Sequence, residues 1–254
     1  MVLILSHQGG SFIEKFIDVF DKNNLTYCVL SSQVNNNRKN SLKKLVDNIF
    51  FIEKDNLESI DLKDFINTHQ NKFKFGCVIS VWEGYRELMA EGNETLNAFD
   101  IPPLLAKQLR DKLYVRTQVI DTKLSLAKCE QLTLKSIEKR LSTNCKSFIK
   151  PRYGLGSVGA KILSGIDDLV YIKDLEKNIL NNKLLKYAIK VDDFIIEDYV
   201  YGVEHSAEVI VCDDAISILA CHYKQQNYTD KTVTEPFSVS PSTIIAGLYD
   251  KLNQ

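Results

Sequence analysis

The sequence predicts an α/β protein: a parallel, doubly wound sheet in the first hundred residues, followed by a second domain of mixed α+β character. Up to about residue 100, short apolar runs alternate with amphipathic segments, which is typical of strands and helices that follow one another in a parallel sheet. Ile101-Pro102-Pro103 then interrupts the pattern. We therefore expect two domains, at residues 1–103 and 104–254.

Hydrophobic spacing predicts each element of the first domain. Apolar runs of strand length predict strands at residues 2–5, 27–30, 49–52 and 76–81. Apolar residues at helical spacing predict helices at 12–20 and 57–66, and the polar stretch 31–40 predicts a loop. Ligands gather beyond the carboxyl ends of parallel strands, so we expect residues 6–11 and 82–84 at the edge of a site. Gly9-Gly10 is only a fragment of a dinucleotide fingerprint, which favours a plain turn or a substrate-facing loop.

The second domain has shorter elements. Helices are expected at residues 104–119 and 134–141, a strand at 147–149, and short β-branched strands broken by glycines from there to about residue 217. Residues 242–252 have the pattern of a beginning helix.

Composition excludes several classes of partner. The formal net charge of −1 over 254 residues gives no basic field of the kind that nucleic acid or an anionic membrane requires. The first residues lack a basic segment, and their apolar run is too short for a signal peptide or a membrane span, so we expect a cytoplasmic protein. Of the six cysteines, Cys28, Cys77, Cys212 and Cys221 adjoin apolar runs and are expected in the core; disulfides or a metal site are the alternatives.

The segment from Ile149 to Gly159 is the first that indicates chemistry. Lys150 ends an apolar strand, and three glycines and Ser157 follow within a few residues. Glycine lets backbone N–H groups approach anionic oxygens, serine adds a hydroxyl donor, and the lysine supplies positive charge. The pattern predicts a loop over phosphates, and a plain β-hairpin is the alternative. It is not a Walker A loop, because no Gly-Lys-Ser/Thr follows the glycines.

The segment from Phe194 to Glu204 supports the phosphate-loop interpretation. An apolar strand ends at Glu197-Asp198, and Glu204 follows seven residues after Glu197. An acceptor beside an extended backbone can pair with the amino edge of adenine, and a second carboxylate can accept both ribose hydroxyls. A solvated strand end followed by a turn at Gly202 is the alternative.

Asp111-Lys112, the glycine-rich segment and the acidic strand end follow one another in an order that resembles the ATP-grasp superfamily. The resemblance covers about residues 75–240 and is greatest to carboxylate–amine ligases with a Rossmann-like domain before the ATP-grasp domain. It implies that Lys112 and Lys150 reach the phosphates and the adenine side of ATP, and that Gly154, Gly156, Ser157 and Gly159 form a lid over the phosphates.

The same resemblance implies that Glu197 accepts from the adenine amino group while the backbone of Asp198, Tyr199 and Val200 pairs with the ring. It implies that Glu204 holds the ribose hydroxyls. Less specifically, it points to Glu208 near the nucleotide and to Glu83 at the first domain's substrate loop. His205 is expected to pack, His222 to lie at the surface, and Lys224 to contact phosphate or substrate or to be an ordinary surface lysine.

The chain departs from the family at its C-terminal end. ATP-grasp ligases hold Mg²⁺ through acidic residues and a Glu-x-Asn pattern, and no Glu-x-Asn occurs after residue 208. We therefore expect an ATP-grasp domain that is incomplete at its C-terminus and provides no Mg²⁺ ligands, with weakened binding and little chemistry. The chain could be part of a larger ligase, pair with a second polypeptide or a second copy of itself, or bind without catalysing.

The expected function is that of an ATP-dependent ligase that forms a C–N bond through an acyl phosphate, from an unknown carboxylate and an unknown amine. A non-catalytic nucleotide-binding or scaffold subunit and a small-molecule kinase on the same fold are the alternatives.

Overall fold

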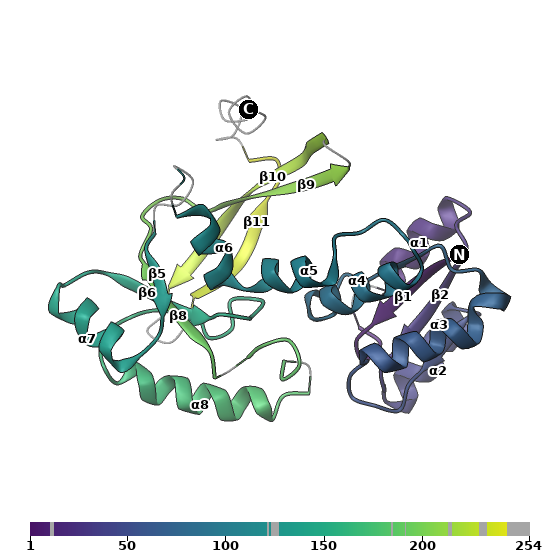
Figure 1. Cartoon of the computed structure of the whole chain (residues 1–254), viewed down its shortest axis with the longest axis horizontal. Coiled ribbons are helices and arrows are strands. Elements are labelled where there is room, and N and C mark those ends of the chain that lie inside the picture. Colours follow the sequence, from purple (N-terminus) through teal and green to yellow (C-terminus); the bar gives the residue numbers. More distant parts are fainter. Residues whose placement is uncertain are drawn as a thin grey trace.

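The structure is a computed structural model that describes residues 1–10, 13–120, 122, 127–183, 185–190, 192–212, 215–228 and 233–242. Its described strands form three sheets, one parallel and two antiparallel (Figure 1). In Figure 1 the parallel sheet lies on the right, the two antiparallel sheets lie on the left, and helix α5 runs between them. No helix in this described part is long and apolar enough to cross a membrane.

The first sheet is parallel, as predicted. Its strand order is β3-β2-β1-β4. The strands are β1 (Val2–Ser6), β2 (Tyr27–Ser31), β3 (Ile49–Phe51) and β4 (Cys77–Ile79).

Helices cover both faces of this sheet, because alternate residues of each buried strand point to opposite faces. In β1, Leu3 and Leu5 pack in one core cluster and Ile4 in the other. Helices α1 (Ile13–Lys22) and α2 (Asn36–Leu45) contribute to the cluster of Ile4, and α3 (Ser59–Phe73) and α4 (Arg86–Thr95) to the cluster of Leu3. The short helix η1 (Glu83–Tyr85) precedes α4.

The predicted loop at 31–40 is wrong in its second half, where α2 begins. The side chain of Asn35 caps this helix by accepting from the N–H of Arg38 at 2.9 Å. The helix contributes one fully buried residue, Leu42, so its sequence is too polar for a hydrophobic pattern to reveal it.

The single helix predicted at 104–119 is also wrong, because the structure has two helices there. Helix α5 (Pro103–Arg110) ends and α6 (Lys112–Val119) begins at Asp111, whose backbone is extended (φ −80°, ψ 100°). The Asp111 carboxylate accepts from the N–H groups of Leu113 and Tyr114, each at 3.0 Å, and so starts the second helix.

The second sheet is antiparallel, with strand order β5-β8-β6-β7. Its strands are β5 (Cys129–Gln131), β6 (Ser147–Pro151), β7 (Lys161–Ile162) and β8 (Phe194–Asp198). Helix α7 (Leu134–Ser142) and helix α8 (Asp168–Leu180) pack on one face, where Ile137 of α7 meets Ile149 and Ile196. The alternate residues Lys150 and Glu197 are therefore directed to the opposite face.

Helix α8 was not predicted, because residues 149–217 were interpreted as short strands broken by glycines. Leu169, Ile172 and Leu175 do recur at helical spacing and pack on the clusters beneath them. The β-branched residues Val170 and Ile172 favoured the interpretation as a strand.

The third sheet is antiparallel, with order β11-β10-β9. It contains β9 (His205–Cys212), β10 (Ala215–Tyr228) and β11 (Val233–Val239). All six cysteines are free; Cys28 and Cys221 are buried as predicted and Cys77 is half-buried, whereas Cys212 is exposed. The predicted helix at 242–252 lies outside the described residues, except for Ser242.

Candidate functional site

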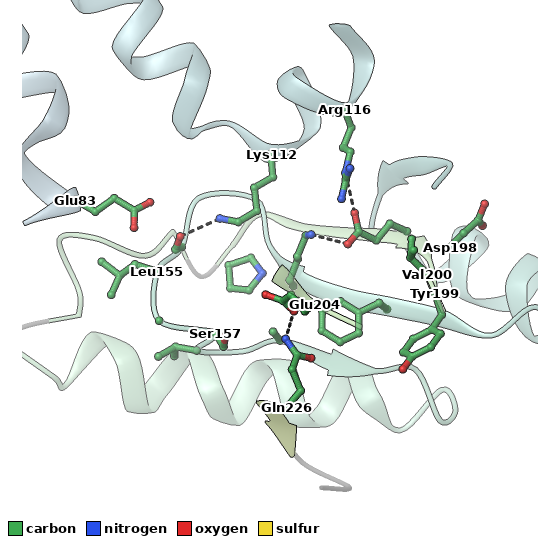
Figure 2. A pocket seen from close by; sticks show the side chains of 18 residues that line it. Glu83, Lys112, Arg116, Leu155, Ser157, Asp198, Tyr199, Val200, Glu204 and Gln226 are labelled. Carbon is green, nitrogen blue, oxygen red and sulfur yellow. Dashed lines mark hydrogen bonds and ion pairs between the residues drawn. The ribbon is translucent and has the colours of Figure 1, made fainter. Parts of the chain in front are cut away.

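A cavity of about 550 Å³ lies between helix α6, the second sheet and the loop that joins β6 to β7 (Figure 2). The predicted binding residues gather in its wall, with the exception of Gly159. Those in the wall are Lys112, Lys150, Gly154, Gly156, Ser157, Glu197, Asp198, Tyr199, Val200 and Glu204. They come from segments as far apart as residues 112 and 204, so the fold brings together motifs that the sequence shows only in order.

The glycine-rich loop is both a hairpin connection and a wall of the cavity. Strands β6 and β7 pair antiparallel on either side of it, so the two interpretations of the segment are compatible. Gly156 (φ 60°) and Ser157 (φ 58°) adopt left-handed backbone conformations, and Val158 N–H donates to the carbonyl of Leu155 at 3.2 Å. These tight turns give the loop a curved inner surface of backbone groups.

Gly159 has a packing role in this loop. Its φ of 77° is left-handed, and a Cβ added there would lie 2.7 Å from Leu175 Cδ2 and 3.1 Å from Pro151 Cγ. The glycine allows the loop to turn back tightly onto helix α8.

Lys112 is the first residue of α6 and extends toward the loop, where its Nζ donates to the carbonyl of Gly154 at 2.9 Å (Figure 2). Burial lowers the pKa of Lys112; the carboxylate of Glu83 opposes this, and the positive charge of Lys150 adds to it. Lys112 and Lys150 thus face one cavity together with Glu83 and Glu197, and the two ammonium groups are charged donors that an anionic ligand could use.

Asp111 fixes the position of Lys112. Besides capping α6, its buried carboxylate accepts from Arg152 Nε at 2.7 Å, from Arg152 Nη2 at 2.5 Å and from Tyr153 Oη at 2.9 Å. Burial would raise the pKa of Asp111, but the hydrogen bonds from Arg152, the Tyr114 N–H and Tyr153 outweigh it and lower the pKa from 3.8 to about 2. The carboxylate therefore joins the start of α6 to the start of the loop.

Glu197 lies deep in the wall, and cations occupy both of its oxygens. Lys150 Nζ is 2.5 Å from Oε1, and Arg116 Nε donates to Oε2 at 3.2 Å. Sequence reasoning missed Arg116, although its spacing of four residues from Lys112 puts both side chains on one face of α6.

The far end of the cavity is formed by the end of β8 and by Glu204. The Asp198 carboxylate turns to Arg140 and accepts from the Lys128 N–H at 3.0 Å, and the Tyr199 N–H donates to the Lys146 carbonyl at 3.0 Å. In the part of the chain that the structure describes, the N–H of Val200 has no hydrogen-bond partner. It is therefore the backbone donor of this strand end that a ligand could use.

Glu204 lies beside two residues of β10. Its carboxylate accepts from Gln226, a wall residue that the sequence did not indicate, and lies 3.9 Å from Lys224 Nζ.

The less specific candidates lie elsewhere, apart from Glu83. Glu83 lines the cavity, whereas Glu208 has a largely exposed side chain 3.7 Å from His222. His205 Nδ1 and Ser242 Oγ form a hydrogen bond at 3.1 Å, and the His205 ring packs edge-on against Tyr223. Lys224 pairs with Glu235 at 2.8 Å.

No three acidic, histidine or cysteine side chains group as a metal site within the described residues.

Comparison with known proteins finds a family model that matches the part of the chain that carries most of the cavity wall. Residues 141–254 match the family model described as the ATP-grasp domain, and this range contains the glycine-rich loop, Glu197 and Glu204. This part of the chain is similar to an ATP-grasp domain. Among curated proteins the comparison finds no match.

Solved structures share the fold of this chain over nearly its whole length. The L-amino acid ligase from Bacillus licheniformis is 15% identical with a TM-score of 0.69, over 95% of this chain and 55% of that one. The biotin carboxylase domain of the Hydrogenobacter thermophilus 2-oxoglutarate carboxylase, in complex with MgADP, ADP and bicarbonate, is 12% identical with a TM-score of 0.70, over 99% and 56%. N5-carboxyaminoimidazole ribonucleotide synthetase from Thermus thermophilus is 14% identical with a TM-score of 0.64, over 99% and 61%. The chain thus spans a little over half the length of these proteins.

Proposed function

We propose that this chain binds ATP in the cavity and is the nucleotide-binding part of an ATP-dependent carboxylate–amine ligase. The observation that supports this best is the grouping of two lysines, a glycine-rich loop, an unpaired strand-end N–H and a separate carboxylate around one cavity. The cavity volume of about 550 Å³ falls within the range of about 300–1,000 Å³ that is usual for small-molecule sites. We propose the boundary between the two domains at residues 103 and 104, where α5 begins.

The proposed orientation of ATP follows the distribution of charge along the cavity. The phosphates lie under the loop, where Lys112, Lys150 and the Ser157 hydroxyl can donate to their oxygens. The adenine ring lies at the end of β8, with the Val200 N–H donating to a ring nitrogen, and Glu204 accepts from the ribose hydroxyls.

Glu197 can serve two purposes in this arrangement. An ionised carboxylate has about four acceptor positions, and Lys150 and Arg116 use only two of them. Glu197 therefore keeps Lys150 extended across the cavity and still has capacity to accept from the adenine amino group.

The proposed reaction has two steps. A carboxylate oxygen of the substrate attacks the γ-phosphorus, the bond to the β–γ bridging oxygen breaks, and ADP leaves with that electron pair. The amine then attacks the acyl carbon, the bond to the phosphate oxygen breaks, and inorganic phosphate leaves as the nitrogen loses a proton. In both steps Lys112, Lys150 and Ser157 orient the phosphates of the nucleotide, and the two lysines balance their charge. The steps above are written for the side chains of this chain alone, and none is assigned to a metal.

Saturation-transfer NMR with ATP, ADP and GTP tests nucleotide binding. We expect adenine and ribose protons to receive saturation from the protein and the signal to be lost in Lys150→Ala. GTP should give a weaker signal, because its 6-carbonyl cannot donate to Glu197. Equal signals from both nucleotides, or none from either, would argue against this orientation.

The reaction is tested by ADP release. A ligase that contains this chain releases ADP only when a carboxylate and an amine are both present. Release that needs no amine and leaves a stable phosphorylated product would identify a kinase, and binding without release would identify a nucleotide-binding subunit.

A further inference from the structure

The glycine-rich loop rests on an apolar cluster beneath it. Leu155 and Val158, on either side of the turn, pack against the buried residues Ile179, Ala188 and Ile189. The position of the loop therefore depends on the other residues that pack against this cluster.

Trp82 packs against the same cluster, although it lies at the edge of the first sheet. It follows β4, and among the described residues it alone packs against both this cluster and the core beneath α3. Figure 2 shows Leu155 at the end of the cavity where Glu83, the residue after Trp82, is also found. Trp82 thus joins the edge of the first sheet to the support of the loop.

Close contacts fix the orientation of the Trp82 ring. It is stacked on the buried His7 with 3.8 Å between ring centroids and 3° between planes, and it meets the edge of Tyr85 at 4.7 Å. A Cβ added at Gly84 would lie 2.4 Å from the Trp82 ring, so glycine is needed there. A large ring held on three sides is a rigid support.

The segment that contains Ala188 and Ile189 completes the cluster, and polar contacts hold this segment against the first sheet. Gln8 Nε2 donates to the carbonyl of Lys183 at 3.1 Å, and Lys186 Nζ lies 3.2 Å from a carboxylate oxygen of Asp55. The His7 ring also meets the edge of Tyr187 at 6.2 Å.

We propose that Trp82 is a positioning residue that holds the glycine-rich loop over the cavity, so that the edge of the first sheet sets where the loop lies. The inference rests on the proposed nucleotide site, because a loop that covers phosphates has to keep one position while they are bound. A ligand at the carboxyl edge of the first sheet would then influence the loop through Trp82.

Hydrogen exchange of the amides of residues 155–160 tests this without nucleotide. We expect Trp82→Ala to raise their exchange about ten-fold, which is the effect of losing part of one buried aromatic contact, and Trp82→Phe to restore most of the protection. Leu96→Ala is the matched control, because Leu96 packs against the first-sheet core and not against the cluster under the loop. Unchanged exchange in Trp82→Ala, or an equal increase in Leu96→Ala, would overturn the proposal.

Fluorescence gives a second readout, since Trp82 is the only tryptophan of the chain. Leu155→Ala should shift its emission to longer wavelength, whereas substitution of the exposed Val19 should not. With ADP we expect a change in wild-type emission and an affinity about ten-fold lower in Trp82→Ala. An unchanged affinity in Trp82→Ala contradicts the inference. If the wild-type chain binds no nucleotide, the proposed function fails, and the exchange comparison alone decides the role of Trp82.

Discussion

Replacement of Asp111 by asparagine should loosen helix α6 from the glycine-rich loop. Asparagine keeps the acceptor that caps the helix but removes the charge that Arg152 contacts at 2.7 and 2.5 Å. The substitution thus separates the ion pair from the cap. Asp111→Ala removes both and should cost about 1 kcal/mol more.

The magnitude follows from the pKa of Asp111, which is lowered from 3.8 to about 2. At 1.36 kcal/mol per unit, this difference corresponds to about 2 kcal/mol of stabilisation by the charged form. Because the pKa is lower in the folded chain than in the unfolded chain, this stabilisation is present above about pH 4 and is lost as pH falls through about 2. The loss in Asp111→Asn should therefore be about 2 kcal/mol at pH 7 and roughly half of that at pH 3.

Hydrogen exchange of the α6 amides, converted to opening free energies, measures this directly. Asp193→Asn is the matched control, because Asp193 also lies beside Arg152, at 3.5 Å, but caps no helix. Its effect on α6 should stay below about 1 kcal/mol. If Asp111→Asn exchanges like the wild type at pH 7, or no faster than Asp193→Asn, the role assigned to Asp111 is refuted.

Three further predictions concern the loop, the phosphate site and the sheet edge. Lys150→Ala should lower ADP affinity about 10- to 100-fold in a calorimetric titration, because a charge-assisted hydrogen bond is lost. Substitution of the exposed Lys139 of α7 by alanine should leave the affinity unchanged. Gly159→Ala should lower the thermal midpoint more than Gly156→Ala does, because both have positive φ but only the first adds a clash. Burial lowers the pKa of His7 from 6.5 to about 4, so the neutral ring is favoured in the fold. The free energy of unfolding of the wild type is therefore unaffected by His7 above pH 6.5 and decreases by about 3 kcal/mol as pH falls to 4, because the unfolded chain takes up the proton first. The thermal midpoint of His7→Phe should change less across that range than the midpoint of the wild type.

Local pattern was enough to predict the first sheet. Its strands are buried on both faces, so apolar runs predicted all four of them, and helical spacing predicted α1 and α3 but not α2 or α4. The exceptions have physical reasons. Helix α2 buries too little for its period to be visible, and the break at Asp111 arises from a capping carboxylate within an unbroken amphipathic pattern.

The candidate site was predictable as a set of motifs but not as a geometry. Lys112, Lys150 and Glu204 were singled out from their order along the chain, and the fold brings them to one cavity. The sequence did not reveal that Glu197 would be paired with Arg116, or that Gly159 would face helix α8, because both depend on contacts between distant segments. The roles assigned to these residues in ATP binding remain predictions.

A calorimetric titration of the 254-residue chain with ADP and with a non-hydrolysable ATP analogue, with and without Mg²⁺, tests the central claim most directly. We predict binding of both nucleotides, with similar affinity in the presence and absence of Mg²⁺, because the described cavity wall provides cationic side chains and loop donors, and no three acidic, histidine or cysteine side chains group as a metal site among the described residues. Absence of heat from either nucleotide under both conditions would contradict the assignment of this cavity as an ATP site.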